Sequence, residues 1–222
     1  MRIISAQALD ADPGLYGEIA QVLSGDGLVC FPCRRQYSIA ASLLSEVAVM
    51  RLVQSKRRSE KAPALVFVPD RKTLSEVVES VPASAVPLID AFWPGQLTMM
   101  LEPSAELPSK VLKTLGQKKL GKIGVRIPSP GIPLRLVEAF GGPVLTSSAN
   151  LSRKTGSHSV SNIRKAFSHT VDLLIDAGDL QPEAPSTVVE LVGDSLQVVR
   201  EGGIPAESIL EILRRGVQPA AG

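Results

Sequence analysis

Short runs of apolar residues alternate with amphipathic segments along the chain. The apolar runs, which predict buried strands, occupy residues 28–31, 64–68, 97–101, 122–127, 143–147, 171–175, 187–191 and 196–199. The amphipathic segments, which predict helices, occupy 13–23, 42–54, 72–79, 83–92, 133–140, 161–167 and 205–215, with Ser161 as an N-cap. This interleaved order predicts a layered α/β fold around a central sheet. The last two strands nearly adjoin and should form a hairpin, so the sheet should be mixed.

Composition is typical of a globular protein with one core. The chain has 222 residues, of which 44% are hydrophobic and 21% charged, and it shows no repeat or linker, so a single domain is expected over 1–222. No apolar run approaches the ~18 residues of a membrane span, and the N-terminus lacks a signal-peptide pattern, which predicts a cytoplasmic protein with no membrane contact. Two cysteines make no disulfide framework and suit a reducing compartment.

The placement of the charges is more informative than their sum. The net charge of +2 is too small to indicate a nucleic-acid partner by itself. The cations nevertheless gather in three groups, within 34–35, 56–61 and 113–122. Each group is either a solvated face or part of an anion-binding site, and charge alone does not decide between them.

Three polar segments could bind an anion. Lys56 and Arg58 could clamp phosphates, although cations at the end of a helix also complement its dipole. The run 146–150 offers hydroxyls and backbone N–H groups after a buried strand, and a capping or turn role fits it equally well. Ser186 and the segment 200–203 form the third, in which glycines allow a close approach of the backbone.

The spacing of Cys30 and Cys33 raises the question of a redox or zinc site. A redox pair of the thioredoxin type needs a helix N-terminus, whereas Cys30 lies inside an apolar run. The two histidines, His158 and His169, are too far apart for the usual zinc spacing. We therefore expect no metal site, and we interpret Cys30 as a small buried hydrophobe.

Seven motifs in order resemble a known family. They are FPxxxxY (31–37), KRR (56–58), WPGQLTMML (93–101), IGVRIP (123–128), SSANLS (147–152), STVVEL (186–191) and VVREGGI (198–204). Together they resemble the YrdC-like family of threonylcarbamoyl-AMP synthases, which includes the YciO branch, over about residues 12–213. The resemblance implies a three-layer α/β fold of the α+β type. Such a fold has a twisted mixed sheet, helices on both faces and a large basic cleft.

The resemblance also implies a nucleotidyltransferase reaction. In that family L-threonine and bicarbonate form a carbamate, which attacks the α-phosphate of ATP, accompanied by Mg²⁺, and releases pyrophosphate. Partner proteins then transfer the threonylcarbamoyl group to tRNA, and double-stranded RNA binding has also been attached to family members. Such chemistry mainly requires cations and backbone donors positioned around the phosphates. Matched residues are Lys56, Arg58, Ser148 and Asn150 for catalysis and ATP, with Arg126, Ser186 and Arg200 lining the nucleotide part.

The first loop departs from the family's pattern. The pattern P-T-acid-T-x-Y-G-L reads PCRRQYSI here, over 32–39. The substrate loop expected from this match consists of Pro32, Cys33, Arg34, Arg35 and Tyr37. Its two arginines should attract anions and repel an ammonium group. If the loop is extended, at most one of them faces the site, because neighbouring side chains alternate.

Two functions follow from this resemblance. The first is an ATP-dependent synthase that acts on L-threonine or another small amino acid, together with bicarbonate, in the service of tRNA modification. The second is a YciO-like paralogue that binds nucleotide or double-stranded RNA without threonine-dependent activity. The phosphate-binding motifs favour the first function, and the arginines of the first loop favour the second.

Overall fold

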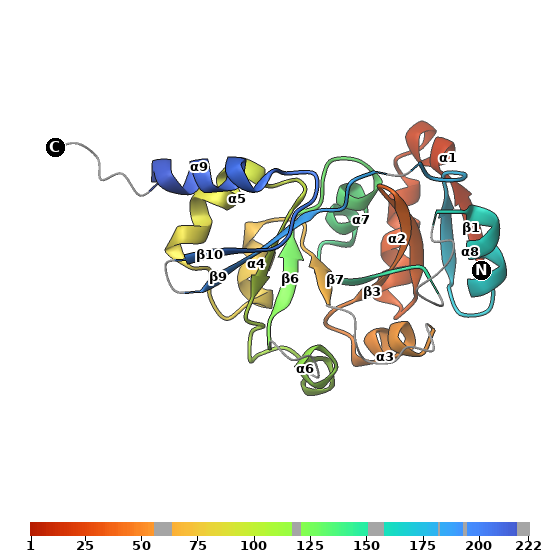
Figure 1. The fold of residues 1–222 in the computed structure, drawn as a ribbon. Coiled ribbons are helices and arrows are strands. Elements are labelled where there is room, and N and C mark those ends of the chain that lie inside the picture. The colour runs from red at the N-terminus through yellow and green to blue at the C-terminus, as the bar shows by residue number, and fades with distance from the viewer. Residues whose placement is uncertain (56–63, 117–120, 151–157, 182, 193–194, 217–222) are drawn as a thin grey trace.

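One ten-stranded sheet organises the chain in a computed structural model that describes residues 1–55, 64–116, 121–150, 158–181, 183–192 and 195–216 (Figure 1). The strands are β1 (Arg2–Ser5), β2 (Val29–Cys33), β3 (Gln36–Ser42), β4 (Leu65–Phe67), β5 (Leu97–Leu101), β6 (Ile123–Arg126), β7 (Val144–Ser148), β8 (Leu173–Asp176), β9 (Thr187–Val192) and β10 (Ser195–Arg200). The helices are α1 (Ala6–Ala11), α2 (Leu15–Ser24), α3 (Glu46–Ser55), α4 (Arg71–Val77), η1 (Ala83–Ala85), α5 (Val86–Phe92), α6 (Ser109–Gly116), α7 (Ile132–Phe140), α8 (Val160–Phe167) and α9 (Ala206–Gly216).

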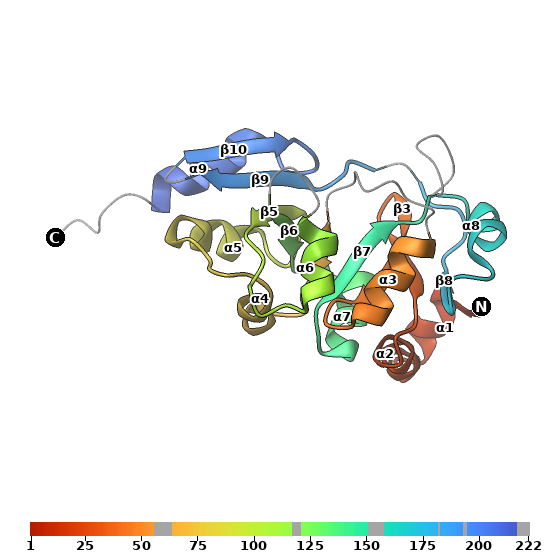
Figure 2. The ribbon, with the colours of Figure 1, turned by 90° about the horizontal axis from the view of Figure 1, so that it is seen from below.

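The sheet is mixed, as the sequence predicts. Its strand order is β1-β8-β2-β3-β7-β4-β6-β5-β9-β10. The pairs β1–β8, β2–β8, β4–β6 and β5–β9 are parallel, and the other neighbours are antiparallel. The predicted hairpin of β9 and β10 forms one edge of the sheet, opposite the β1 edge. In Figure 2 the sheet extends along the molecule, with the N-terminus near the β1 edge and α9 near the β10 edge.

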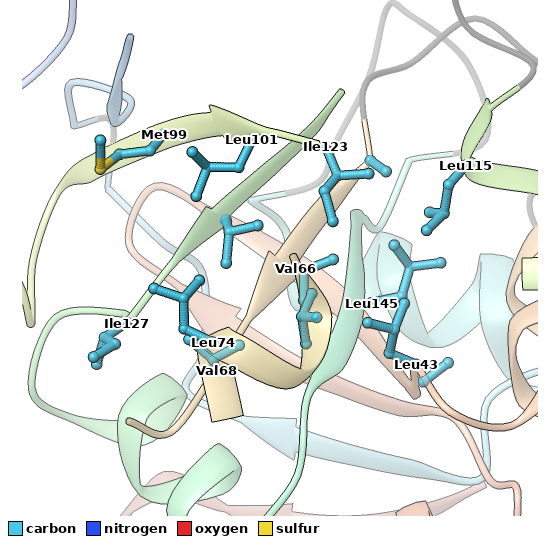
Figure 3. Close-up of a cluster of buried hydrophobic side chains, with 14 of the residues drawn as sticks. Leu43, Val66, Val68, Leu74, Met99, Leu101, Leu115, Ile123, Ile127 and Leu145 are labelled. Carbon is cyan, nitrogen blue, oxygen red and sulfur yellow. The ribbon is translucent and has the colours of Figure 1, made fainter. Parts of the chain in front are cut away.

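Helices pack on both faces of the sheet, which confirms the three-layer architecture. On one face, strand residues such as Val66, Leu101 and Leu145 form a buried cluster (Figure 3) with residues of α3, α4, α5, α6, α8 and α9. On the other face, α1, α2 and α7 contribute a second cluster that includes Ile19 and Leu136. Burial of these apolar side chains, at roughly 1.5–3 kcal/mol each, is the main force that holds the layers together.

The second cluster covers only part of its face. Its strand residues come from β1, β2, β3, β4, β7 and β8, and among the described residues none comes from β5, β6, β9 or β10. On this face, the described side chains of β5 and β6 are therefore not part of the core formed with α1, α2 and α7. The chain between β8 and β9 crosses the molecule on its way from one half of the sheet to the other (Figure 1).

Several elements differ from the predicted segments. The strands β1 and β3 and the helices α1 and α6 lie outside them, and α3 begins at Glu46 rather than at residue 42. Nearly all of β3 is buried, so it lacks the alternation by which a strand is recognised. Ser161 as N-cap is wrong, because α8 follows Ser159 and its first N–H, that of Val160, donates to Asp179. No helix in the described part of the chain is long and apolar enough to cross a membrane.

Candidate functional site

Four neighbouring strands bring polar residues to one end of the sheet. The register pairs Met99 on β5 with Val125 on β6, and Thr98 on β5 with Val188 on β9. Val188 in turn pairs with Arg200, at an irregularity near the end of β10. Because these residues are at the same level of the sheet, three predicted nucleotide-binding residues come together there: Arg126, Ser186 and Arg200.

Arg200 is anchored to Ser186 by three hydrogen bonds. Its Nε and Nη2 donate to the Ser186 carbonyl oxygen at 3.2 and 2.8 Å, and Nη2 also donates to Ser186 Oγ at 3.0 Å. The buried Thr98 hydroxyl donates to the same Oγ at 3.1 Å. Arg200 itself is exposed, and its hydrogen bonds to Ser186 hold its guanidinium in place.

The glycines that follow Arg200 have a packing role. A Cβ on Gly202 would lie 2.2 Å from the Pro185 carbonyl oxygen, so only glycine fits there. The next N–H, of Gly203, donates to the same oxygen at 2.8 Å. The sequence predicts a close approach of the backbone at these glycines, and the structure shows that they approach Pro185, just before β9. This contact fixes the chain that follows Arg200.

Arg126 is a buried cation without a carboxylate partner among the described residues. Its side chain is only 5% exposed, and its guanidinium carbon lies 4.7 Å from the centre of the Phe67 ring. Nη2 is 3.8 Å from Cys33 Sγ, whereas Nε has no hydrogen-bond partner within the described part of the chain. Burial lowers the pKa of Arg126, and the nearby Arg34 and Arg200 act in the same direction. A buried charge is costly unless it is paired, so this arrangement favours an anionic ligand.

The predicted substrate loop is a tight β-hairpin. β2 and β3 pair up to Cys33 and Gln36, which leaves Arg34 and Arg35 as the two turn residues. Arg34 has a φ of 57°, in the left-handed region. The alternation expected for an extended loop does not apply to the two arginines, because the chain turns at these residues.

Arg34 reaches the site, and Arg35 lies next to it in the turn. Arg34 Nη2 forms an ion pair with Glu183 at 2.5 Å, and its Nη1 lies 2.5 Å from the Gln96 amide when the amide oxygen faces it. Arg35 is exposed. Partial burial of Arg200 lowers the pKa of Arg200, and the positive charge of Arg35 lowers it further. We call the four residues Arg34, Arg35, Arg126 and Arg200 the arginine cluster.

A pocket of about 350 Å³ opens beside the arginine cluster. Pro32, Cys33 and Arg34 form one wall, and Arg126 lies at the sheet end. The loop 128–131 and the first two residues of α7 form another wall. Residues from the crossing between β8 and β9, Ala177 and Glu183, complete it. The pocket therefore joins the hairpin to the strand ends where the nucleotide-binding residues were expected.

Ser148 and Asn150 lie beside the hairpin, at the end of β7. Ser148 pairs with Ser38 of β3, and its Oγ donates to Asn150 Oδ1 at 2.9 Å. The start of β7 pairs with Phe67, which pairs with Arg126. Since side chains alternate along a strand, Ser148 is on the same face of the sheet as Arg126. Lys56 and Arg58, the remaining predicted catalytic residues, lie outside the described residues.

Comparison with known proteins identifies the family. The model of the Sua5/YciO/YrdC family, described as "Telomere recombination", matches residues 21–202. The chain belongs to the Sua5/YciO/YrdC family. It is 31% identical over 216 residues to the putative threonylcarbamoyl-AMP synthase of Mycobacterium tuberculosis, covering 95% of each chain. It is also 32% identical over 186 residues to the threonylcarbamoyl-AMP synthase of Pyrococcus abyssi, with 84% of this chain covered but only 53% of that protein.

Solved structures of the Sua5/YciO/YrdC family share the fold. The structure of P. abyssi Sua5 complexed with L-threonine has a TM-score of 0.80 and 27% sequence identity, and the match covers 96% of this chain and 61% of that one. Escherichia coli YciO has a TM-score of 0.73 at 23% identity, with 94% and 98% covered. The second likeness supports the fold alone. The chain spans about three fifths of the P. abyssi structure.

Tyr37, which the family resemblance places in the substrate loop, does not face the site. It is fully buried, and its hydroxyl donates to the Gly178 carbonyl oxygen at 2.7 Å and accepts from the Ala177 N–H at 3.0 Å. Its own carbonyl oxygen accepts from the Ala149 N–H. Tyr37 thus connects the hairpin to β7 and to the crossing between β8 and β9, and its part in a substrate loop stays a prediction.

Replacing Tyr37 by phenylalanine should lower the free energy of unfolding by about 2 kcal/mol, because two buried hydrogen bonds are lost. Burial raises the pKa of Tyr37 to about 12 from its ordinary 10. As the pH rises, the Tyr37 hydroxyl therefore loses its proton in the unfolded chain before it does so in the folded chain. The difference in free energy of unfolding between wild type and variant should be complete below pH 10 and should shrink as the pH rises from 10 to 12. Urea unfolding of both proteins across this range tests the prediction, and a difference independent of pH would contradict it.

The two cysteines do not form a redox pair. Cys30 and Cys33 are both free and buried, and they belong to clusters on opposite faces of the sheet. Burial raises the pKa of Cys33, so its thiol stays protonated near neutral pH despite the arginines around it. In the part of the chain that the structure describes, no group of three or more His, Cys, Asp or Glu side chains could hold a metal ion.

Sequence reasoning missed three neighbours of the arginine cluster: Gln96, Glu183 and Phe67. Gln96 lies within the WPGQL motif, directly after a proline and a glycine, so this motif could have identified it as a candidate site residue. Phe67 was recognised only as a strand residue. Glu183 lies in a connection without a motif, and only the crossing between β8 and β9 brings it to the hairpin.

Proposed function

We propose that this chain is an ATP-dependent synthase that joins a carbamate of a small amino acid to AMP. The observation that carries the proposal is Arg126, which is 5% exposed, lies near the exposed Arg200, and has an Nε without a partner among the residues that are described. An anionic ligand would offset the cost of that buried charge. The names of the M. tuberculosis and P. abyssi relatives supply the reaction class, and L-threonine is the family's expected amino acid.

The reaction needs positioning and charge more than covalent catalysis. The amino group of the amino acid combines with bicarbonate, losing water, to give a carbamate. A carbamate oxygen then bonds to the α-phosphorus of ATP while the bond to pyrophosphate breaks, and negative charge moves onto the leaving group. Arg126 and Arg200 are suited to hold phosphate oxygens, because guanidinium groups donate in fixed directions. Mg²⁺ would arrive with ATP as part of this substrate.

The remaining predicted residues take supporting roles in this proposal. Ser186, hydrogen-bonded to Arg200 and Thr98, fixes the guanidinium and could contact ribose or phosphate. Ser148 presents a hydroxyl on the face of the sheet that carries Arg126, and this hydroxyl donates to the Asn150 amide oxygen. Lys56 and Arg58 are proposed on the family motif alone. The product would then serve tRNA modification through partner proteins.

Pyrophosphate release from ATP tests the proposal. Release should require both bicarbonate and an amino acid, and ATP binding alone should not require either. Arg200→Gln should weaken ATP binding about 10-fold or more, since a charged hydrogen-bond donor is removed. Folded protein that binds ATP but releases no pyrophosphate with any of the twenty amino acids would refute the synthase.

A second candidate function rests on the hairpin. Arg34 and Arg35 place two cations at a turn beside the site, and Arg35 is exposed. A YciO-like paralogue could use this turn to bind the phosphates of double-stranded RNA or tRNA. Such binding should weaken steeply with salt and fall in the double variant Arg34→Ala and Arg35→Ala. RNA binding whose affinity depends neither on the salt concentration nor on the double variant would count against this function.

A further inference from the structure

Gln96 lies between the strand ends that carry the arginine cluster, directly before β5. The N–H of the preceding residue, Gly95, donates to the carbonyl oxygen of Ile127, the neighbour of Arg126, at 3.0 Å. The Gln96 carbonyl oxygen accepts from the N–H of Thr187, the first residue of β9, also at 3.0 Å. The backbone at Gln96 is thus fixed on one side to the end of β6 and on the other to the start of β9.

The side chain of Gln96 reaches from this fixed backbone to the β2–β3 hairpin. With its amide oxygen facing Arg34, it accepts from Nη1 at 2.5 Å and from Nη2 at 3.3 Å. A Cβ on Gly203 would overlap the end of the Gln96 side chain, so glycine at this position leaves the amide where it is. The turn after Arg200 and the Gln96 side chain therefore fit together, and Gln96 connects this turn to the hairpin.

The contact with the hairpin keeps two like charges close together. Arg34 and Arg126 line the same pocket, and the charge of Arg34 contributes to the lowered pKa of Arg126. Glu183 pairs with Arg34 Nη2, but the Glu183 side chain is 48% exposed, and among the described residues no carboxylate pairs with Arg126. Repulsion would drive the flexible Arg34 side chain away from Arg126 and towards the exposed Glu183. The Gln96 amide opposes this movement, because its oxygen accepts from both Nη atoms.

We propose that Gln96 is a positioning residue: by holding Arg34 beside Arg126, its amide raises the affinity of the arginine cluster for a phosphate ligand that Gln96 itself does not touch. This inference rests on the proposed function and adds a residue to its site. An anion at Arg126 is then attracted by a second guanidinium charge, and in a partly buried site this attraction is screened less than in water. A neutral amide orients the Arg34 cation without cancelling its charge.

Calorimetric titration of the full chain with ATP and with inorganic pyrophosphate tests the inference. Gln96→Leu should weaken the binding of both ligands about 3- to 10-fold, because Arg34 is released. Gln96→Glu keeps an acceptor but neutralises Arg34, and it should weaken binding about 10-fold or more. Gly203→Ala displaces the amide without changing residue 96, so it should reproduce the effect of Gln96→Leu. Gly17→Ala, at an open position of α2, is the matched control and should leave binding unchanged.

A second background distinguishes positioning from a merely structural role. Arg34→Asn removes the cation and keeps a residue that tolerates the left-handed turn. If Gln96 acts through Arg34, adding Gln96→Leu to Arg34→Asn should weaken binding no further, although the same change weakens binding in the wild type. An equal loss of affinity in both backgrounds would show that Gln96 acts on the fold of the site, and it would overturn the inference.

The outcomes separate this inference from the proposed function. Coupling between Gln96 and Arg34 in pyrophosphate binding, in a protein that releases no pyrophosphate from ATP with any amino acid and bicarbonate, would support the positioning role and refute the synthase. Pyrophosphate release by the wild type, combined with unchanged binding of ATP and pyrophosphate in Gln96→Leu, would support the synthase and overturn the positioning role.

Discussion

Replacing Arg126 by methionine should stabilise the folded protein by about 1–2 kcal/mol while weakening ATP binding about 10- to 100-fold. The guanidinium is buried, its Nε lacks a partner in the segments that the structure describes, and Arg34 and Arg200 repel it. A methionine keeps the apolar stem against Phe67 and removes the buried charge. Opposite changes in stability and binding are typical of a residue retained for its ligand.

Urea unfolding and calorimetric titration with ATP measure the two effects of Arg126→Met. Arg126→Lys is the first control, since it keeps the charge and should gain no stability. Arg71→Met, at the exposed pair with Asp90, is the second and should change neither quantity by more than about 0.5 kcal/mol. If Arg126→Met instead unfolds more easily and binds ATP normally, the guanidinium is a structural group and the site lies elsewhere.

Replacing Thr187 by valine should cost about 3 kcal/mol of stability, although the two side chains have the same shape. The fully buried Thr187 hydroxyl donates to the Ile204 carbonyl oxygen at 2.6 Å and accepts from the N–H groups of Gly202 and Ile204 at 2.9 and 3.1 Å. Valine would leave these backbone groups without a partner. The same hydroxyl fixes the turn after Arg200, so ATP binding should weaken as well.

Thermal and urea unfolding of Thr187→Val measure this cost. Thr114→Val is a matched control, because the Thr114 hydroxyl lies at an exposed helical turn, where it donates to the Lys110 carbonyl oxygen at 2.8 Å and makes a weak 4.0 Å contact with Met50 Sδ. That variant should stay within about 0.5 kcal/mol of the wild type. Equal losses in the two variants would show that the hydroxyl network at Thr187 does not hold the strand ends together.

The elements that the sequence predicted correctly have clear local boundaries. The run 97–101 coincides with β5, since Pro94 and Gly95 precede it and Pro103 follows. The turn between β2 and β3 was missed because glycine, asparagine or aspartate normally occupies such a turn, whereas Arg34 adopts a left-handed conformation here. Tertiary contacts of Arg34 with Glu183 and Gln96 accompany that conformation, and no local pattern encodes them.

The residues of the candidate site could be proposed from motifs, but their arrangement could not. The motifs around Arg126, Ser186 and Arg200 identified three residues that the register of β5, β6, β9 and β10 brings together. The pocket depends on the crossing between β8 and β9, which places Glu183 beside the hairpin. Tyr37 matched the family motif and yet is buried, because a motif records a position in the chain and not the direction of its side chain.

Mass spectrometry of a reaction with isotopically labelled bicarbonate tests the central claim most directly. The protein, ATP, Mg²⁺ and an amino acid are mixed with bicarbonate that carries heavy carbon, and adenylates are detected in the quenched mixture. The account predicts an adenylate that contains both the amino acid and the labelled carbon. An adenylate without the label, or none from protein that binds ATP, would contradict it.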